Sequence, residues 1–270
     1  MLKARILTAV VLIPLFLGAL FFLSDELWIG VTLAVTMLAC REWGRMAGFS
    51  KMLIQLYLVL SFMLSWFVLW LIHVDSARIL FFYGSSAIFW LVVAPSWLAL
   101  GWHVRHPLAM ALVGWVVLIP TWLALIDLRL YGPWLLLGVM AIVWIADTAA
   151  YFTGRRFGEH KLAPLISPGK TWEGVAGAAA AVGIYAWFLV FSGNTDALAI
   201  DPPWLILSIW VLMGFSIIGD LFESSIKRNA GLKDSGNMLP GHGGILDRID
   251  SLTAALPLAA LGLMLTQLLP

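Results

Sequence analysis

The sequence predicts an all-α, polytopic integral membrane protein with about nine transmembrane helices. Of its 270 residues, 62% are hydrophobic and only 11% are charged, whereas roughly 25% of the residues of soluble domains are charged. The apolar residues also occur in runs close to the roughly 20 residues that a helix needs to cross a bilayer. This composition excludes a water-soluble globule, so we expect the lipid bilayer, and not a nucleic acid, as the partner of the chain.

Nine apolar runs are the candidate spans. They cover residues 6–23, 27–40, 52–72, 79–99, 107–126, 134–153, 175–191, 204–222 and 249–269. The first run follows the basic residues Lys3 and Arg5, as a signal peptide would, but it has no small-residue cleavage site before Ser24. We therefore interpret it as a retained span.

The basic residues predict the orientation. With a cytoplasmic N-terminus, only Arg78 and Arg129 of the 16 Lys and Arg residues fall on the outer side, which is a strong positive-inside bias. We expect one integral membrane domain over 1–270, in which 1–130 mainly anchors and packs and 131–270 supplies the catalytic helices. The two cytoplasmic loops of that second part, 154–174 and 223–248, are more polar than a connector requires.

The segment from 223 to 250 is the strongest candidate for chemistry. Its four basic residues balance four acidic ones, whereas a lipid-binding patch would have charges of one sign. They are Lys227, Arg228, Lys233 and Arg248 against Glu223, Asp234, Asp247 and Asp250. Such a mixture suits divalent cations on the carboxylates and phosphates on the basic groups. The nearby glycines 241, 243 and 244 would let a ligand approach the backbone closely.

Three carboxylates are candidate metal ligands. Asp247 and Asp250 share a face at the start of the last helix and repel each other unless a cation lies between them. Asp220 ends the preceding span, at a depth where an unpaired carboxylate is costly. Mg²⁺ prefers one or two carboxylates together with substrate phosphates, which fits Asp220 with Asp247 or Asp250. A helix cap is the structural alternative for Asp247, but it does not explain Asp220.

Asp147 lies about seven residues before the expected end of its helix at Gly154, hence roughly 10 Å inside the membrane. It should face the protein interior. Two interpretations remain open: Asp147 pairs with a buried Lys or Arg, or it lines the same cavity as Asp220 and supports the metal.

The stretch from Ser167 to Gly174 contains Gly-Lys-Thr but is not a P-loop, because Pro164 stands where the first glycine is required. Ser167, Lys170 and Thr171 instead suggest a phosphate-contacting loop before a helix N-terminus, and Glu173 has the alternative of capping that helix. His242, between glycines and far from other histidines, fits a phosphate contact or a proton carrier better than a zinc site.

At these motifs the sequence resembles the phosphatidate cytidylyltransferase family, also called CDP-diacylglycerol synthases. Ser224 to Asp250 matches that family's signature at every fixed position: Ser, any residue, an aliphatic, Lys-Arg, four residues, Lys-Asp, later Leu-Pro-x-His-Gly-Gly, and finally Asp-Arg-x-Asp. Ser167 to Gly174 resembles the family's S-P-x-K-T-W-E-G loop, and Asp147-Thr148 and Arg41-Glu42-Trp43 resemble its earlier segments. The detailed resemblance covers about 140–256.

The resemblance implies that phosphatidic acid and CTP give CDP-diacylglycerol and pyrophosphate, with Mg²⁺ required and a second cation left open. It implies metal binding by Asp220, Asp247 and Asp250, with Lys227, Arg248 and His242 beside them in the catalytic centre. The expected substrate-binding residues are Asp147, Ser167, Lys170, Thr171, Ser224, Arg228 and Lys233. The expected location is a bacterial inner membrane, with the active site on the cytoplasmic side.

Two other functions are weighed against this one. A CTP-dependent polyprenol or phytol kinase would release CDP instead of pyrophosphate. A secondary transporter would also place Asp147 and Asp220 in membrane helices, but its charges would lie at the midplane and its halves would repeat. A homodimer stays open, because the small residues from Gly174 to Gly183 permit helix pairing within or between chains.

Overall fold

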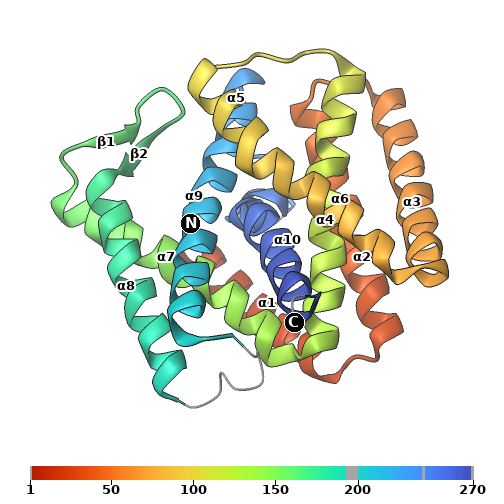
Figure 1. Cartoon of the computed structure of the whole chain (residues 1–270). Helices are drawn as coiled ribbons and strands as arrows, with labels where there is room; N and C mark the ends of the chain where they lie inside the picture. Colours follow the sequence, from red (N-terminus) through yellow and green to blue (C-terminus); the bar gives the residue numbers. More distant parts are fainter. Residues whose placement is uncertain (1, 193–199, 239–240, 269–270) are drawn as a thin grey trace.

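The computed structural model describes residues 2–192, 200–238 and 241–268, which form a helical bundle with one small hairpin (Figure 1). Among these residues, seven helices are long and apolar enough to cross a membrane. They confirm an all-α, multi-pass membrane protein, whereas the count of nine spans and the N-terminal orientation stay predictions. The helix from Asp25 to Met46 is not among the seven, and it has charged residues in its first turn and near its end.

The first half of the chain contains six α-helices. They are α1 (Leu2–Phe22), α2 (Asp25–Met46), α3 (Lys51–Val74), α4 (Ile79–Ile88), α5 (Ala94–Leu100) and α6 (Pro107–Tyr131). A 3₁₀ turn, Ser76–Arg78, precedes α4, and a π-helical turn, Phe89–Val93, joins α4 to α5. These four pieces continue one another as a single apolar stretch, Ser76–Leu100, which corresponds to the predicted span 79–99.

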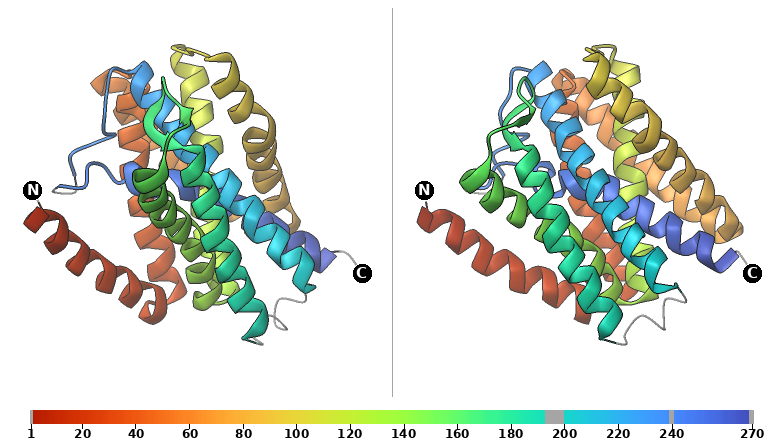
Figure 2. Two further views of the ribbon diagram at one scale, coloured as in Figure 1. Left: turned by 90° about the vertical axis from the view of Figure 1, so that its left-hand side faces the viewer. Right: turned by 60° about the vertical axis from the view of Figure 1, so that its left-hand side comes forward.

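The described residues of the second half form four α-helices and a two-stranded antiparallel sheet. Its elements are α7 (Pro133–Phe157), β1 (Lys161–Ala163), β2 (Ser167–Thr171), α8 (Trp172–Phe191), α9 (Pro202–Asn229) and α10 (Leu246–Leu268). The hairpin projects beyond the ends of α7 and α8, and α1 slants away from the other helices (Figure 2).

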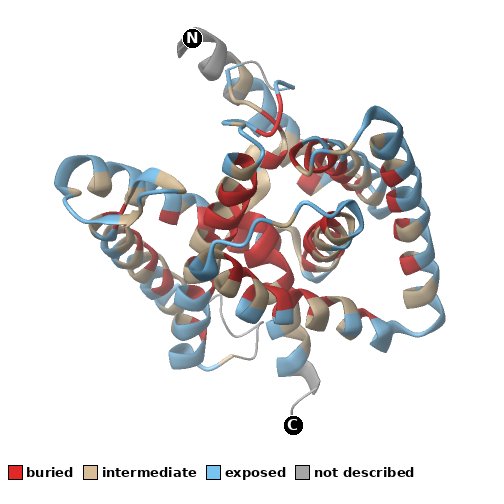
Figure 3. Ribbon diagram, turned by 90° about the horizontal axis from the view of Figure 1, so that it is seen from above, coloured by how far each residue is buried: buried red, intermediate tan, exposed pale blue. Residues whose placement is uncertain are grey.

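The last helix, α10, passes through the middle of the bundle and contacts α4, α6, α7 and α9. Its residues Ala254, Ala255 and Leu256 are fully buried. Seen from above, buried residues gather toward the centre and exposed ones lie on the outside (Figure 3). The outward faces are nevertheless rich in large apolar residues such as Phe62 and Trp66 on α3, as expected of surfaces that meet lipid.

The helix pair α7 and α8 packs through small residues. A Cβ atom on Gly174 would lie 2.9 Å from the carbonyl oxygen of Ala150, and one on Gly177 would overlap the Thr153 side chain. Glycines at these positions let the two backbones approach closely. This confirms that the Gly174–Gly183 stretch presents a small packing face, and it is used here within one chain.

Both predicted loops contain more regular structure than the apolar pattern indicates. The helix α7 continues to Phe157 and α9 to Asn229, while β1 and β2 occupy much of 154–174. The added turns are polar and end in basic residues, Arg155 and Arg156 in α7 and Lys227 and Arg228 in α9. Basic residues favour a helix C-terminus, but polar turns leave no apolar run by which to predict them.

Candidate active site

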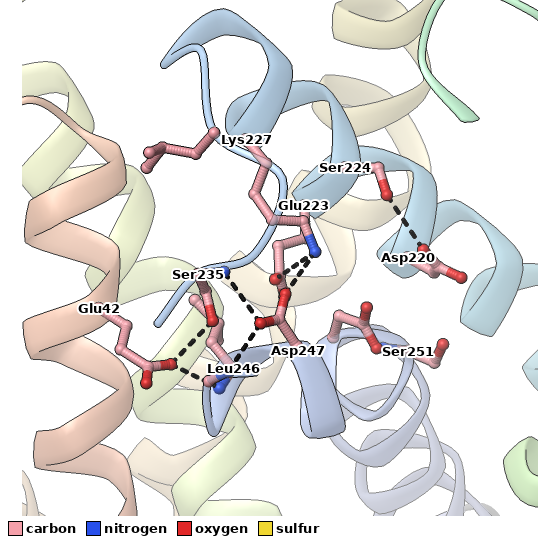
Figure 4. A network of polar contacts seen from close by, with 12 residues as sticks. Glu42, Asp220, Glu223, Ser224, Lys227, Ser235, Leu246, Asp247 and Ser251 are labelled. Atoms are coloured by element: carbon pink, nitrogen blue, oxygen red, sulfur yellow. Dashed lines mark hydrogen bonds and ion pairs between the residues drawn. The ribbon is translucent and has the colours of Figure 1, made fainter. Parts of the chain in front are cut away.

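The polar residues of the site meet where α9 ends and α10 begins (Figure 4). Lys227 is at the centre: its Nζ lies 2.7 Å from Asp247 Oδ1 and 3.0 Å from Glu223 Oε1. The three side chains are less than a tenth exposed, at 9%, 6% and 5% respectively. A buried lysine between two carboxylates is a compensated arrangement, in which each charge depends on the others. These two ion pairs engage two of the three ammonium donors of Lys227.

Asp247 also organises the loop before α10. Its Oδ2 accepts the backbone N–H of Ser235 at 2.9 Å and that of Gly244 at 2.8 Å. The helix-end role weighed for Asp247 is therefore observed, together with the pairing to Lys227. Both oxygens are used within the protein, and metal binding by Asp247 stays a prediction.

A second buried carboxylate, Glu42 on α2, holds the same loop from the other side (Figure 4). Its Oε1 accepts from Ile245 N at 3.1 Å, and its Oε2 accepts from Leu246 N and from Ser235 Oγ, both at 2.9 Å. Glu42 is 5% exposed. It thus accepts hydrogen bonds from the free N–H groups of Ile245 and Leu246 and places a negative charge at the positive N-terminus of α10.

The glycines of the loop make room for these carboxylates. A Cβ on Gly236 or Gly244 would overlap the Glu42 carboxylate, and one on Gly243, whose φ is +82°, would lie 2.7 Å from Asp247 Oδ2. The sequence suggested that the glycines admit a ligand. In the structure, the groups that approach closely are the side chains of the protein itself.

Asp220 lies one helical turn before Ser224 on α9 and faces the hairpin. Its Oδ2 is 2.6 Å from Nζ of Lys170, on β2, and its Oδ1 accepts from Ser224 Oγ at 3.2 Å. The Lys170 and Asp220 side chains are 24% and 25% exposed. The two predicted cytoplasmic segments therefore meet here, and a predicted phosphate contact lies directly beside a predicted metal ligand.

Asp147 and Asp250 complete the acidic side of the site. Asp147, on α7, lies within electrostatic range of Asp220, Lys170 and Arg248. Asp250, on α10, lies within range of Asp220 and Asp147. Asp147 makes no ion pair among the described residues and is exposed, so of the two interpretations the structure favours the one that groups it with Asp220.

Hydrogen bonds and an ion pair hold the hairpin of β1 and β2 in place. The Thr171 hydroxyl accepts from Gly174 N at 3.1 Å and caps α8, so the cap is Thr171 and not Glu173. Glu173 instead lies 2.6 Å from His160 Nδ1. Arg228 donates to the carbonyl oxygen of Ile166, which ties α9 to the hairpin. Substrate contacts of Thr171 and Arg228 stay predictions beside these structural roles.

The remaining predicted residues make fewer contacts. Lys233 and Arg248 are exposed, Ser167 is half-buried on β2, and none of the three has an ion pair among the described residues. His242 is half-buried, and its Nδ1 is buried without a hydrogen-bond partner in the described structure.

Glu42 and Ser235 have no role predicted from the sequence. The signal for Glu42 was the charged Arg41-Glu42-Trp43 at the end of an apolar run. Nothing local marked Ser235, because its partners lie far away in the chain.

The acidic groups fit a divalent cation that is completed by its substrate. Within the described residues, no three Asp, Glu, His or Cys side chains gather closely enough to hold a metal ion by themselves. Asp220 and Asp250 nevertheless lie within range of each other, and the only hydrogen bond described for the Asp250 carboxylate is to one of its two oxygens. Two carboxylates with substrate phosphates are the usual environment of Mg²⁺.

Comparisons with known proteins match nearly the whole chain. Residues 3–266 match the Cytidylyltransferase family. The chain is 40% identical to the phosphatidate cytidylyltransferase of Haemophilus influenzae, covering 95% of this chain and 96% of that one. It is 38% identical to the phosphatidate cytidylyltransferase of Pseudomonas aeruginosa, covering 96% of each. The family match and the alignments with these relatives extend well beyond the motifs around the site. The chain is therefore a member of the cytidylyltransferase family.

Proposed function

We propose that this chain is a phosphatidate cytidylyltransferase, which transfers the cytidylyl group of CTP to phosphatidic acid and releases pyrophosphate. The observation that carries the proposal is the meeting of Lys170 with Asp220, 2.6 Å apart, beside the buried Lys227–Asp247 pair. Lys170, Lys227 and Asp247 belong to the two motifs that resemble the family, and Asp220 lies four residues before the second motif. The near full-length relatives carry the same activity in their names.

The reaction needs positioning and charge neutralisation more than acid–base catalysis. A phosphate oxygen of the lipid forms a bond to the α-phosphorus of CTP, and the bond from that phosphorus to the β-phosphate oxygen breaks. Because the attacking phosphate is already an anion at neutral pH, no strong general base is required. Such a step is accelerated by holding its partners in line and stabilising the charge that develops.

Some of these residues position the loop before α10, and others would contact the substrates. Lys227, Asp247 and Glu42 fix the loop before α10, and so fix where Arg248 and Asp250 lie. Lys170, Arg248 and the third donor of Lys227 supply positive charge for the phosphates, with Ser167, Ser224, Arg228, Lys233 and His242 as further contacts. Asp220 and Asp250 would hold Mg²⁺, with Asp147 nearby, and the ion would support the attacking and leaving oxygens as a Lewis acid.

The site should admit one substrate from water and one from the bilayer. Asp147 lies ten residues before the end of α7 at Phe157, roughly 15 Å along the helix. An exposed carboxylate within a membrane-spanning helix is stable only where water reaches it. We therefore propose a polar recess that opens to the cytoplasm for CTP and sideways for the lipid, in the inner membrane of a bacterium.

The test is pyrophosphate release by the purified protein in detergent with CTP, phosphatidic acid and Mg²⁺, each omitted in turn. Release that requires all three components supports the proposal, including its cation. CDP formation with a lipid alcohol would indicate the kinase instead. If folded protein forms neither pyrophosphate nor CDP, both enzyme activities are contradicted, and the transporter becomes the function to test.

A further inference from the structure

A pocket of about 220 Å³ lies beside the site, between the end of α2 and the connector from α9 to α10. No role follows for it from the motifs that resemble the family. It is lined by Leu38, Arg41, Glu42, Arg45, Asn237 and Met238. The connector passes the end of α2 at this end of the bundle (Figure 2), so the pocket joins the two halves of the chain.

Two arginines give the pocket its charge. Arg41 and Arg45 are four residues apart on α2, hence on one face, and both are exposed. Neither guanidinium has a hydrogen bond or ion pair within the described part of the chain. Like charges at this spacing disfavour a helix. An anion bound between them would remove that repulsion, and guanidinium groups match phosphate oxygens in geometry.

The other walls suit an amphiphilic ligand. Leu38 and Met238 are apolar, whereas Asn237 offers an amide. The volume of about 220 Å³ is below the roughly 300–1,000 Å³ of sites that enclose drug-sized molecules. The pocket is therefore too small for a whole nucleoside triphosphate and fits a phosphate group with the first atoms attached to it.

Glu42 connects the pocket to the loop before α10. It lines the pocket, and its two carboxylate oxygens accept from Ser235, Ile245 and Leu246. These three donors offset its negative charge toward a bound anion. Asn237 follows Ser235 by two residues, and Ser235 N donates to Asp247, so a group held in the pocket lies next to the loop that carries the site.

We propose that Arg41 and Arg45, with Asn237, bind the phosphate monoester of the lipid substrate, and that Leu38 and Met238 contact the glycerol part beside it. This assignment rests on the proposed function, because it deepens the substrate side of that reaction. It gives the first half of the chain a direct part in substrate binding.

The kinetic test uses the double variant Arg41→Gln/Arg45→Gln, with Arg105→Gln as the matched control. Arg105 is also an exposed arginine without a described partner, in the connector before α6. We expect the apparent KM for phosphatidic acid, as its mole fraction in mixed micelles, to rise roughly tenfold or more, the factor that corresponds to one strong interaction. The KM for CTP should stay unchanged, and the control should behave as wild type.

Other kinetic results overturn the assignment. A rise in the KM for CTP alone would show that the pocket holds the triphosphate. Unchanged constants for both substrates would exclude the pocket from binding either one. The charge-conserving variant Arg41→Lys/Arg45→Lys should recover part of the lipid affinity, which a merely structural role would not predict.

A binding test does not depend on turnover. A ligand that binds the folded state raises its melting temperature, so we expect a short-chain phosphatidic acid to stabilise the wild type and Arg105→Gln but not the double Gln variant. Loss of the lipid effect with an unchanged melting temperature of the free protein supports the subsite even where the wild type releases no pyrophosphate. Equal stabilisation of all three proteins contradicts it.

Discussion

The Oε2 atom of Glu42 accepts a hydrogen bond from the backbone N–H of Leu246 at 2.9 Å, although the two residues lie 204 positions apart. Leu246 is the first residue of α10, and its free N–H group would normally be satisfied by a cap close in sequence. Here a buried carboxylate from another helix does this. The start of the last helix, with Asp247 and Asp250 on it, is therefore located by α2.

Replacing Glu42 with Gln tests this relationship. The amide keeps one acceptor oxygen but exchanges the other for an NH₂ group, which cannot accept from the loop. At least one buried donor loses its partner, so we expect the free energy of unfolding to fall by about 1–3 kcal/mol. The turnover should also fall, because the loop before α10 is displaced and the start of α10, with Asp247, moves with it. Denaturation curves and the pyrophosphate assay measure the two effects.

Glu159→Gln provides the control for Glu42→Gln, since Glu159 is exposed and lies in the connector between α7 and β1. It should leave both stability and turnover near the wild-type values. If Glu42→Gln also matched the wild type in both, the carboxylate charge would not be what positions the loop.

Asp220 and Asp247 should respond differently to the same substitution. Asp220→Asn removes a charge that is a quarter exposed, so we expect a protein that melts like the wild type but has no turnover. Asp247→Asn also leaves Lys227 with fewer partners in a buried site, so we expect it to lose stability as well as turnover. Melting curves and the pyrophosphate assay on both variants separate the two effects.

Asp201→Asn is a suitable control for this pair, because Asp201 is exposed before α9 and its side chain forms no capping hydrogen bond. Its activity should be unchanged. Near-normal turnover of Asp220→Asn would remove Asp220 from the proposed metal site.

Lys227→Met tests whether the buried charges depend on one another. The substitution leaves Glu223 and Asp247 buried without their cation, and breaking a buried pair in this way costs about 3–5 kcal/mol. Adding Glu223→Gln removes one of the two uncompensated charges, so the double variant should be more stable than Lys227→Met alone. A double-mutant cycle of unfolding free energies gives the coupling. Additive effects of the two substitutions would show that the residues act independently.

The sequence was sufficient for the class of fold and for the segments that meet at the candidate site. Long apolar runs predict membrane helices because the bilayer imposes their length, and the described helices follow those runs. The balanced charges around Lys227 and Asp247 predicted a functional site in the segment 223–250. The structure brings this segment together with Lys170 and Asp220. These features are encoded in neighbouring residues.

The features that were missed depend on contacts between distant residues. Glu42 contacts the loop before α10 only because α2 packs beside this loop. No local sequence pattern predicts that contact. The glycines of the loop were interpreted as space for a ligand, whereas Gly236 and Gly244 give room to Glu42. The hairpin of β1 and β2 is too short and too polar to produce a clear alternation of apolar residues.

The packing of α8 on α7 offers a test away from the charged groups. In Gly177→Ala the new methyl group would overlap Thr153, so the helices must separate or Thr153 must move, at a typical cost of about 1–3 kcal/mol. Gly262→Ala is the matched control, since a Cβ on Gly262, in α10, has no other atom within 4 Å. We expect a lower melting temperature for Gly177→Ala and no loss for Gly262→Ala. Because α7 carries Asp147 and β2 leads into α8, the turnover of Gly177→Ala should fall too, and equal stability of the two variants would contradict the close packing of these helices.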